Sequence, residues 1–236
     1  MGRIVVKDAV KRYGKKVALK GVSFEVGDGE LFAYIGPNGA GKTTTVKALL
    51  GIITLDGGEA RILSDKILAG GKDVGFVLED ELPFESLTPY EYLRFYAEVY
   101  GGVSDGRIEE MLKKMGLWDD RKRRIKGFSN GMKRKLCLAK ALIASPSVVL
   151  LDEPTQGIEV DTRKQIRELL VEYARNGGTV FITTHNLYEI ETICTSFGVI
   201  MDGEFLGKWN KGELGDKSLE DFYMELKRGR EYVDAH

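Results

Sequence analysis

The sequence of 236 residues is poor in cysteine and histidine, and this scarcity excludes several kinds of site. Cys137 and Cys194 are the only cysteines, too few for a disulfide-stabilised scaffold or for a zinc site of four cysteines. The two histidines are likewise too few for a histidine-rich metal centre. Two thiols without an obvious disulfide role fit a reducing compartment.

Long apolar runs and an excess of one charge are also lacking. The most apolar stretches, such as residues 148–151, are far shorter than the roughly 18 residues of a membrane-spanning helix. Lys7 and Asp8 interrupt the N-terminal apolar run too early for a signal peptide. With 35 Lys+Arg against 36 Asp+Glu, the net charge is −1, so we expect no nucleic-acid partner. These features predict a cytoplasmic protein.

What the sequence does contain is an alternation of strand and helix patterns. At 43% hydrophobic and 30% charged residues, the chain is typical of a folded protein with a sizeable core. Apolar runs and period-two alternation predict strands at 4–6, 22–26, 31–35, 59–63, 74–78, 148–152, 179–183, 197–201 and 204–208. Apolar spacing and capping residues predict helices at 42–50, 107–115, 129–144 and 161–175, after His185, and from Thr88 and Ser218.

This order predicts an α/β fold with a mainly parallel sheet and helices on its faces. The sequence begins with β-rich segments, and a helical block then interrupts the alternation. We expect one domain over 1–236, with a core at about 1–85 and 146–216, a helical subdomain at about 86–145, and a C-terminal helix at about 217–236.

The clearest motif is the glycine-rich loop of residues 36–43, Gly-Pro-Asn-Gly-Ala-Gly-Lys-Thr, which fits G-x-x-x-x-G-K-[ST]. It follows a predicted strand and opens a predicted helix, the context in which backbone N–H groups and a helix N-terminus hold phosphates. Lys42 would then reach the β and γ phosphates, and the Thr43 hydroxyl would bind Mg²⁺. The alternative is a glycine-rich turn without a ligand. The expected nucleotide-binding residues here are Gly36, Asn38, Gly39, Ala40, Gly41, Lys42, Thr43 and Thr44.

Polar residues at the ends of two later strands complete the predicted site. Asp152 and Glu153 close the apolar strand 148–152, where Asp152 would bind Mg²⁺ and Glu153 would activate water. His185 follows the strand 179–183, at the strand end where parallel sheets bind ligands, and could contact the γ-phosphate. The alternatives are a charged strand end at the surface and a structural histidine.

Together these motifs resemble the ATP-binding subunits of ABC transporters, and the resemblance covers essentially the whole chain. It implies a P-loop NTPase fold of the ABC-ATPase type, with an antiparallel β subdomain and an inserted helical subdomain. It also implies that the chain uses ATP and Mg²⁺. Tyr13 matches the aromatic residue that stacks on adenine, and Val17 would pack beside it. Ser129, Asn130 and Gly131 match the signature that binds the γ-phosphate held by the other copy of a nucleotide-sandwich dimer, formed with itself or a related ATPase.

The chain departs from the family pattern in four features, and two of them point to one branch of the family. Glu79 stands where the family has a glutamine that lines the metal, and its extra charge would change Mg²⁺ or water contacts. The signature reads Ser-Asn-Gly-Met, and the following loop has Gln156 and Glu159 where serine and aspartate are usual. Glu79, this signature and the tail after Ser218 resemble the ABC-2-type exporter branch. In that branch the ATPase pairs with a separate membrane permease, on the cytoplasmic face of the membrane.

Three alternatives stay open from the sequence. A soluble, non-transport ABC ATPase would share the same motifs. A GTP-binding switch is suggested by residues 210–213, Asn-Lys-Gly-Glu, a near match to the guanine-reading Asn-Lys-x-Asp. The basic run 121–126 is either solvated surface or a contact for anionic lipid headgroups.

Overall fold

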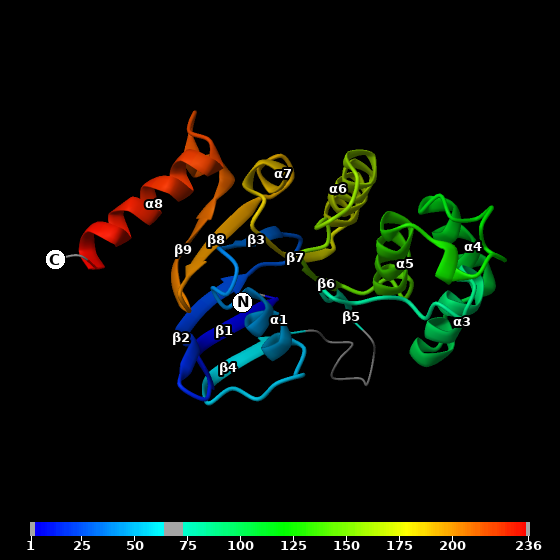
Figure 1. Cartoon of the computed structure of the whole chain (residues 1–236), viewed down its shortest axis with the longest axis horizontal. Coiled ribbons are helices and arrows are strands. Elements are labelled where there is room, and N and C mark those ends of the chain that lie inside the picture. Colours follow the sequence, from blue (N-terminus) through cyan, green and yellow to red (C-terminus); the bar gives the residue numbers. More distant parts are fainter. Residues whose placement is uncertain (1–2, 64–72, 235–236) are drawn as a thin grey trace. The chain divides into compact units, whose positions relative to one another are not determined.

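The computed structural model describes residues 3–63 and 73–234, and the chain divides into two compact units (Figure 1). The first unit comprises Met1–Ile62 and Phe181–His236, and the second comprises Leu63–Val180. The sheet strand β7 (Thr179–Thr184) runs through the boundary, so its first two residues belong to the second unit.

An antiparallel sheet in the first unit joins β2 (Lys16–Val26), β1 (Ile4–Tyr13) and β4 (Gly57–Ile62) in that order. Strands β1 and β2 are longer than the sequence predicted, because one hairpin pairs Tyr13 with Lys16 and Ile4 with Val26. Asp8, with φ of 48°, lies in a β-bulge. Strand pairing continues beyond Lys7 and Asp8, the charged residues that follow the predicted strand. The Asp8 backbone N–H donates to Ser23 Oγ at 2.8 Å.

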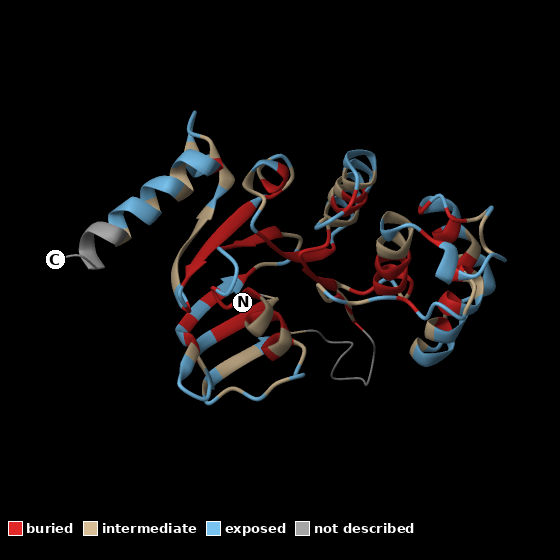
Figure 2. Cartoon of the chain, in the orientation of Figure 1, coloured by how far each residue is buried: buried red, intermediate tan, exposed pale blue. Residues whose placement is uncertain are grey.

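The first unit also holds a mixed sheet in which β7, β3 (Leu31–Ile35), β8 (Ser196–Met201) and β9 (Glu204–Asn210) are consecutive neighbours. β3 and β8 are parallel, whereas β8 and β9 are antiparallel. The predicted α/β fold is therefore confirmed. Every residue of β3, β7 and β8 is buried (Figure 2). The helices of this unit are α1 (Lys42–Leu49), α7 (Leu187–Glu191) and α8 (Leu219–Asp234).

Five aromatic rings form the core beneath β3. Phe24, Phe32, Tyr34, Phe181 and Phe205 contact one another with ring centroids 5.1 to 6.3 Å apart. Each such pair adds about 0.5–1.5 kcal/mol beyond the apolar area it buries. Burial raises the pKa of Tyr34 above its ordinary range, so this phenol stays neutral. The cluster gives the end of β3 a rigid base.

The second unit contains two parallel strands and four α-helices within its described residues. Strands β5 (Val74–Val77) and β6 (Val148–Asp152) pair in parallel. The predicted helical block is confirmed as α3 (Pro89–Tyr100), α4 (Asp105–Lys114) and α5 (Asn130–Leu142), followed later by α6 (Val160–Arg175). The capping box predicted at Thr88 is present, since Thr88 Oγ1 accepts from the Glu91 N–H at 3.2 Å and the Glu91 carboxylate accepts from the Thr88 N–H at 2.8 Å.

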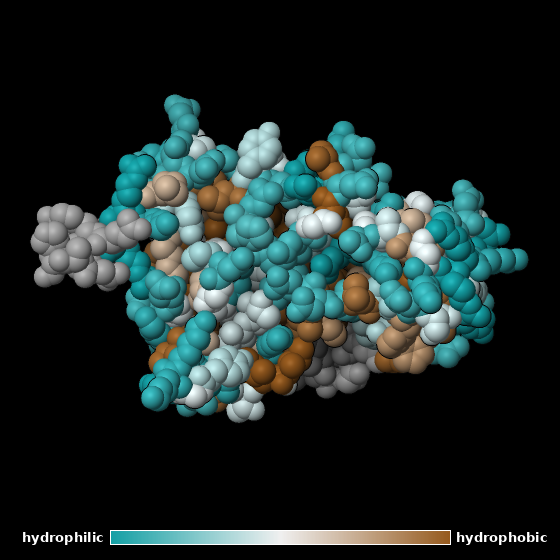
Figure 3. Space-filling view, in the orientation of Figure 1, coloured by the Kyte–Doolittle hydropathy of each residue, from teal (hydrophilic) through white to brown (hydrophobic). Residues whose placement is uncertain are grey.

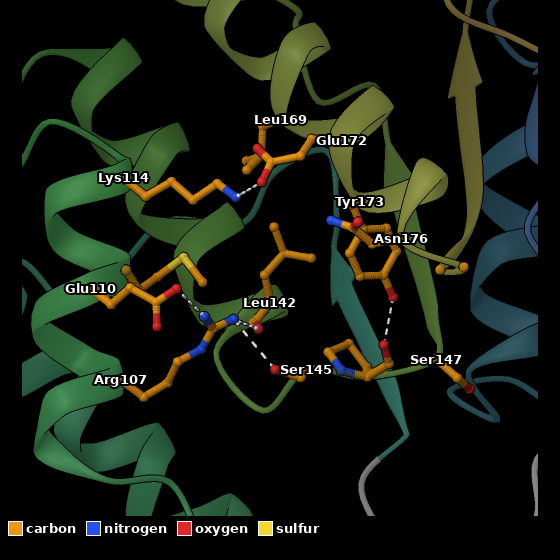
Figure 4. Close-up of a pocket in the computed structure, with 14 residues that line it drawn as sticks. Arg107, Glu110, Lys114, Leu142, Ser145, Ser147, Leu169, Glu172, Tyr173 and Asn176 are labelled. Atoms are coloured by element: carbon orange, nitrogen blue, oxygen red, sulfur yellow. Dashed lines mark hydrogen bonds and ion pairs between the residues drawn. The ribbon is translucent and has the colours of Figure 1, made fainter.

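The turn between α5 and β6 is held from two sides, around a cavity of about 460 Å³ (Figure 4). Arg107 on α4 donates to the Leu142 carbonyl and to Ser145 Oγ, both at 3.4 Å, and so caps the last turn of α5. From α6, Tyr173 Oη donates to the Pro146 carbonyl at 2.6 Å. These bonds fix the path of the chain into β6, whose other end carries Asp152.

Among the described residues, no helix is both long enough and apolar enough to cross a membrane. The face drawn in Figure 3 is mostly hydrophilic, with apolar side chains gathered in separate patches. Exposed large apolar side chains in the second unit include Leu82, Phe84, Phe95 and Val99, on α3 and the segment before it.

Gly75 provides a test of the packing between β5 and α5. A Cβ at this position would lie 2.0 Å from the Ala141 carbonyl oxygen, a contact that neither backbone can avoid. Gly75→Ala should therefore lower the free energy of unfolding by about 3 kcal/mol, measured by urea denaturation.

The matched control is Gly106→Ala on α4, where an added Cβ meets only Ser104 Oγ at 3.7 Å. Because alanine suits a helix better than glycine, this variant should gain about 0.5–1 kcal/mol. Equal stability of the two variants would contradict the packing described for Gly75.

Candidate functional site

The glycine-rich loop leaves the end of β3 through a turn that has no room for a side chain. A Cβ on Gly36 would lie 2.3 Å from the Ile200 carbonyl oxygen, and one on Gly41 would lie 2.7 Å from the Ala18 carbonyl oxygen. Gly39 and Gly41 also have φ of 81° and 114°, in the left-handed region that favours glycine. The path of this loop therefore requires the glycines that the motif supplies.

Lys42, the first residue of α1, folds back over this loop. Lys42 is only 6% exposed. Its Nζ donates to the Gly36 carbonyl at 2.7 Å and to the Pro37 carbonyl at 3.3 Å. Thr43 and Thr44 follow in the first helical turn and are half-buried. The helix N-terminus, an ammonium group and the absence of acidic residues from the first turn make this loop favourable for anionic phosphates. The other predicted loop residues are Asn38 and Gly39, which are exposed, and Ala40, which is buried.

The hairpin end of β1 and β2 lies beside the glycine-rich loop. Tyr13 is the last residue of β1 and is 49% exposed, with Lys11 Nζ 5.5 Å from its ring centroid. Val17 is half-buried on β2. Next to Val17, Lys16 Nζ lies 3.8 Å from the point that a Cβ on Gly39 would occupy. Lys16 is thus a cation close to the loop that the motif analysis missed, and its only signal in the sequence is its place beside Lys15.

His185 is the first residue after β7 and is exposed. The turn that carries it is well defined, because the Asn186 N–H donates to Thr184 Oγ1 at 2.9 Å and Asn186 Oδ1 accepts from the Glu189 N–H at 3.2 Å. Asn186 is therefore the N-cap of α7. The first unit brings together the hairpin end with Tyr13 and the glycine-rich loop, and it also carries His185 at the end of β7.

In the second unit, the buried strand β6 ends in two carboxylates, as predicted. Asp152 is fully buried and Glu153 is 5% exposed. Glu153 has φ of 47°, a left-handed conformation that costs a non-glycine residue about 1–3 kcal/mol. The following turn closes on it, since the Gln156 N–H donates to the Glu153 carbonyl at 3.2 Å. This unusual backbone turns the chain sharply at the carboxylate.

A hollow of about 410 Å³ in the second unit gathers three segments that are distant in the sequence. Its lining includes residues 79–82, Asn130 and residues 156–158. Ser129, just before Asn130, is the N-cap of α5 and accepts from the Met132 N–H at 3.3 Å. A Cβ on Gly131 would lie 3.1 Å from Thr162 Oγ1, so α5 begins close against α6. Glu79 and the predicted signature thus belong to one compact region.

Each unit offers oxygen atoms of the kind that Mg²⁺ prefers. In the first unit Thr43 offers a hydroxyl, and in the second unit Asp152 and Glu79 offer carboxylates. In the described part of the chain, no group of three or more His, Cys, Asp or Glu side chains could hold a metal ion. Such a cage is not needed for Mg²⁺, which usually binds one or two protein oxygens together with phosphates and water.

Two further sequence features make contacts within their own unit. In the basic run, Arg121 lies 4.3 Å from the Trp118 ring centroid, and Arg123 and Arg124 pair with Asp120 and Glu91, each at 3.1 Å. These arginines are therefore engaged within the second unit.

The guanine-like segment forms a capping box. The Asn210 N–H donates to Glu213 Oε2 at 3.1 Å, and Asn210 Nδ2 donates to Glu213 Oε1 at 2.9 Å. This use of both side chains does not favour the GTP-switch alternative.

Comparisons with known proteins agree on one family. A family model described as "ABC transporter" matches residues 19–156. The linearmycin resistance ATP-binding protein LnrL of Bacillus subtilis is 34% identical over 92% of this chain and 72% of its own length. The lantibiotic transport ATP-binding protein SrtF of Streptococcus pyogenes is 33% identical over 92% of this chain and 94% of its own. A fluoroquinolones export ATP-binding protein of Mycobacterium tuberculosis is 34% identical over 89% of this chain and 72% of its own.

Solved structures give the same result. The ATP-binding subunit of an ABC transporter superposes with a TM-score of 0.82 at 30% identity, covering 95% of this chain and 99% of that one. An ATP-binding cassette in its ADP conformation superposes with a TM-score of 0.77 at 21% identity, covering 94% and 99%. The latter likeness concerns the fold alone.

Gly41 tests whether the shape of the loop matters for nucleotide binding. Gly41→Ala adds a Cβ that meets the Ala18 carbonyl and forces an L-residue to a φ of 114°. The loop must shift, so the dissociation constant for ATP should rise at least about tenfold, measured with a fluorescent ATP analogue.

Gly29→Ala is the control, because Gly29 has a φ of 70° with nothing within 4 Å of an added Cβ. It should lose about 1 kcal/mol of stability and keep its affinity for ATP. If Gly41→Ala bound ATP with unchanged affinity, the loop would not be part of the ATP-binding site.

Proposed function

Since this chain belongs to the ABC transporter family as an ATP-binding and ATP-hydrolysing subunit, we propose that it powers an exporter by acting on a separate membrane permease. The observation that carries the proposal is the glycine-rich loop between the buried strand β3 and helix α1, with Lys42 folded over it. The names of three relatives, which refer to antibiotic resistance, lantibiotic transport and fluoroquinolone export, support the exporter reading.

In this proposal ATP binds along the first unit. The Tyr13 ring stacks on adenine, with Val17 beside it, and such stacking contributes about 1–3 kcal/mol per base. The backbone N–H groups of residues 38–44 and the N-terminus of α1 hold the phosphates. Lys42 would exchange its carbonyl contacts for the β and γ phosphates. The exposure of Tyr13 and the close approach of Lys16 to the loop support this arrangement.

We assign the Mg²⁺ contacts to Thr43 and Asp152, with Glu79 close to the same ion. When bound, the metal neutralises charge on the phosphates. Asp152 suits this task because it is buried and ends a rigid strand, and Thr43 suits it because its hydroxyl lies in the first turn of α1.

Hydrolysis replaces the bond between the γ-phosphorus and its bridging oxygen by a bond to water, giving ADP and phosphate. Glu153 would accept a proton from that water and orient it, while Lys42 and His185 would stabilise the charge on the γ-phosphate. The burial of Glu153 and its position directly after the buried strand β6 support this role.

Two copies would sandwich two ATP molecules, either as a homodimer or with a related ATPase. Each copy would present Lys42, Asp152 and Glu153 to one nucleotide, and its Ser129–Gly131 segment to the nucleotide on the other copy. The N-terminus of α5, with the positive end of its helix dipole, suits an anion there. A homodimer of this kind is isologous, and ATP favours its closed state because nucleotide completes the interface.

The permease would receive the movement from the helical block of residues 86–145, which we propose as a subdomain next to Glu79. The chain would then work at the cytoplasmic face of the membrane. The apolar side chains exposed on α3 and before it, such as Phe84 and Phe95, support a protein contact in this region. The alternative, a soluble ABC ATPase without a permease, has no comparable support.

The first test is phosphate release from Mg·ATP as a function of protein concentration. Turnover per chain should rise with concentration, and Glu153→Gln should reduce kcat by at least about 100-fold while it still binds ATP. Glu168→Gln, an exposed glutamate on α6, is the matched control and should keep full activity. Rapid turnover by Glu153→Gln would exclude Glu153 as the base.

The second test separates the exporter from the soluble alternative. Glu153→Gln carrying an affinity tag should retain an integral membrane protein during purification in mild detergent with ATP, because the closed dimer persists when hydrolysis is blocked. Lys42→Met should lose that ATP dependence. Purification of the chain alone under every nucleotide condition would favour the soluble alternative.

A further inference from the structure

One face of helix α5 holds the segment that carries Glu79. Arg134, Cys137 and Lys140 recur at a spacing of three, so they lie along one side of the helix. Arg134 Nη1 donates to the Leu78 carbonyl at 3.0 Å, and its Nη2 donates to the Glu79 carbonyl at 2.8 Å. These bonds attach the backbone of Glu79 itself to α5.

A buried ion pair completes the attachment two residues further on. Lys140 is 1% exposed, and its Nζ donates to Glu81 Oε1 at 2.6 Å. Glu81 Oε2 accepts from the Leu78 N–H at 3.3 Å, so this carboxylate also shapes the segment internally. The Cys137 thiol donates to the Glu81 carbonyl at 3.8 Å.

The surroundings of Lys140 are those of a fixed charge. The ring centroids of Phe76 and Tyr96 lie 4.3 and 5.7 Å from its Nζ, so aromatic faces and one carboxylate replace water. Burial raises the pKa of the neighbouring Cys137 to about 11, which leaves that thiol uncharged. A buried pair of this kind adds little stability compared with apolar side chains of the same size. Stability alone therefore does not account for this ion pair.

The position of the segment that carries Glu79 suggests a functional role for the ion pair. Residues 79–82 line the same hollow as Asn130, and α5 begins directly after Ser129. The side chains of Arg134, Lys140 and Glu81, which we call the α5 latch, thus join Glu79 to the helix that begins with the signature. We propose that the α5 latch positions Glu79 for ATP hydrolysis by making residues 78–81 and α5 move as one body. This inference rests on the function proposed above.

The test removes the latch without leaving a buried charge unpaired. The double variant Glu81→Met with Lys140→Met deletes both partners, and Arg134→Met deletes the backbone contacts. Each should raise hydrogen–deuterium exchange in residues 78–82 by about tenfold, while strand β6 stays protected. This measurement needs no turnover, so it remains informative even if the proposed function fails.

Kinetics then separates positioning from folding. The two latch variants should reduce kcat by about 10- to 100-fold and change the dissociation constant for ATP by less than about twofold. In a Glu79→Ala background the same changes should have no further effect on kcat, because the side chain that they position is already absent. Lys140→Arg should retain most of the activity. Lys113→Met is the matched control, since Lys113 also pairs with a carboxylate, Glu109, and lies over a ring, Trp118, but is exposed.

Unchanged exchange in residues 78–82 would overturn the proposal. So would an equal loss of kcat in the wild-type and Glu79→Ala backgrounds, since this would indicate a general structural effect. An absence of turnover in the wild-type chain, with exchange responding as expected, would count against the proposed function and leave the attachment of the segment to α5 supported.

Discussion

Burial of β3, β6, β7 and β8 along their whole length is the constraint on which the rest of the structure depends. A charged group inside such a strand would lose its hydration without a partner to replace it. The ionisable and glycine-rich segments of the candidate site accordingly lie at the ends of these strands. The glycine-rich loop follows β3, two carboxylates close β6, and His185 follows β7. In both units, candidate site residues thus lie at strand ends.

The same constraint explains why these ends have unusual backbones. At Gly36 the neighbouring strand β8 occupies the space of a side chain, and at Glu153 the backbone is left-handed. The left-handed backbone at Glu153 lowers stability relative to an ordinary turn. The aromatic cluster beneath β3 and the bonds that hold the α5–β6 turn offset that loss nearby. The strands whose ends carry these features are therefore stabilised by packing or hydrogen bonds elsewhere along the same strands.

Much of this fold could be predicted from the sequence, because strong local signals determine it. The buried strands 31–35 and 148–152 were predicted with their observed bounds, and the caps at Thr88 and Ser129 act as expected. The full length of β1 could not be predicted, because the bulge at Asp8 depends on how β1 pairs with β2 and β4.

The candidate site was less predictable beyond its motifs. The residues of the glycine-rich loop and the acidic end of β6 follow from short patterns, but their roles in one nucleotide site remain predictions. Lys16 was missed because its proximity to Gly39 arises from the hairpin, not from a motif. Lys140 was missed because a lysine in a helix rich in basic residues is normally exposed. Its burial depends on Glu81, 59 residues earlier in the chain.

That last contact has a consequence for inheritance and engineering. Positions 81 and 140 are far apart in the chain, but Glu81 and Lys140 form an ion pair in which each charge balances the other. A chimera that takes α5 from a relative with an uncharged residue at position 140 would leave the carboxylate of Glu81 stranded, unless residues 78–81 came from the same parent. The two segments therefore form a single module for recombination, although more than 40 residues of α3, α4 and their connections lie between them.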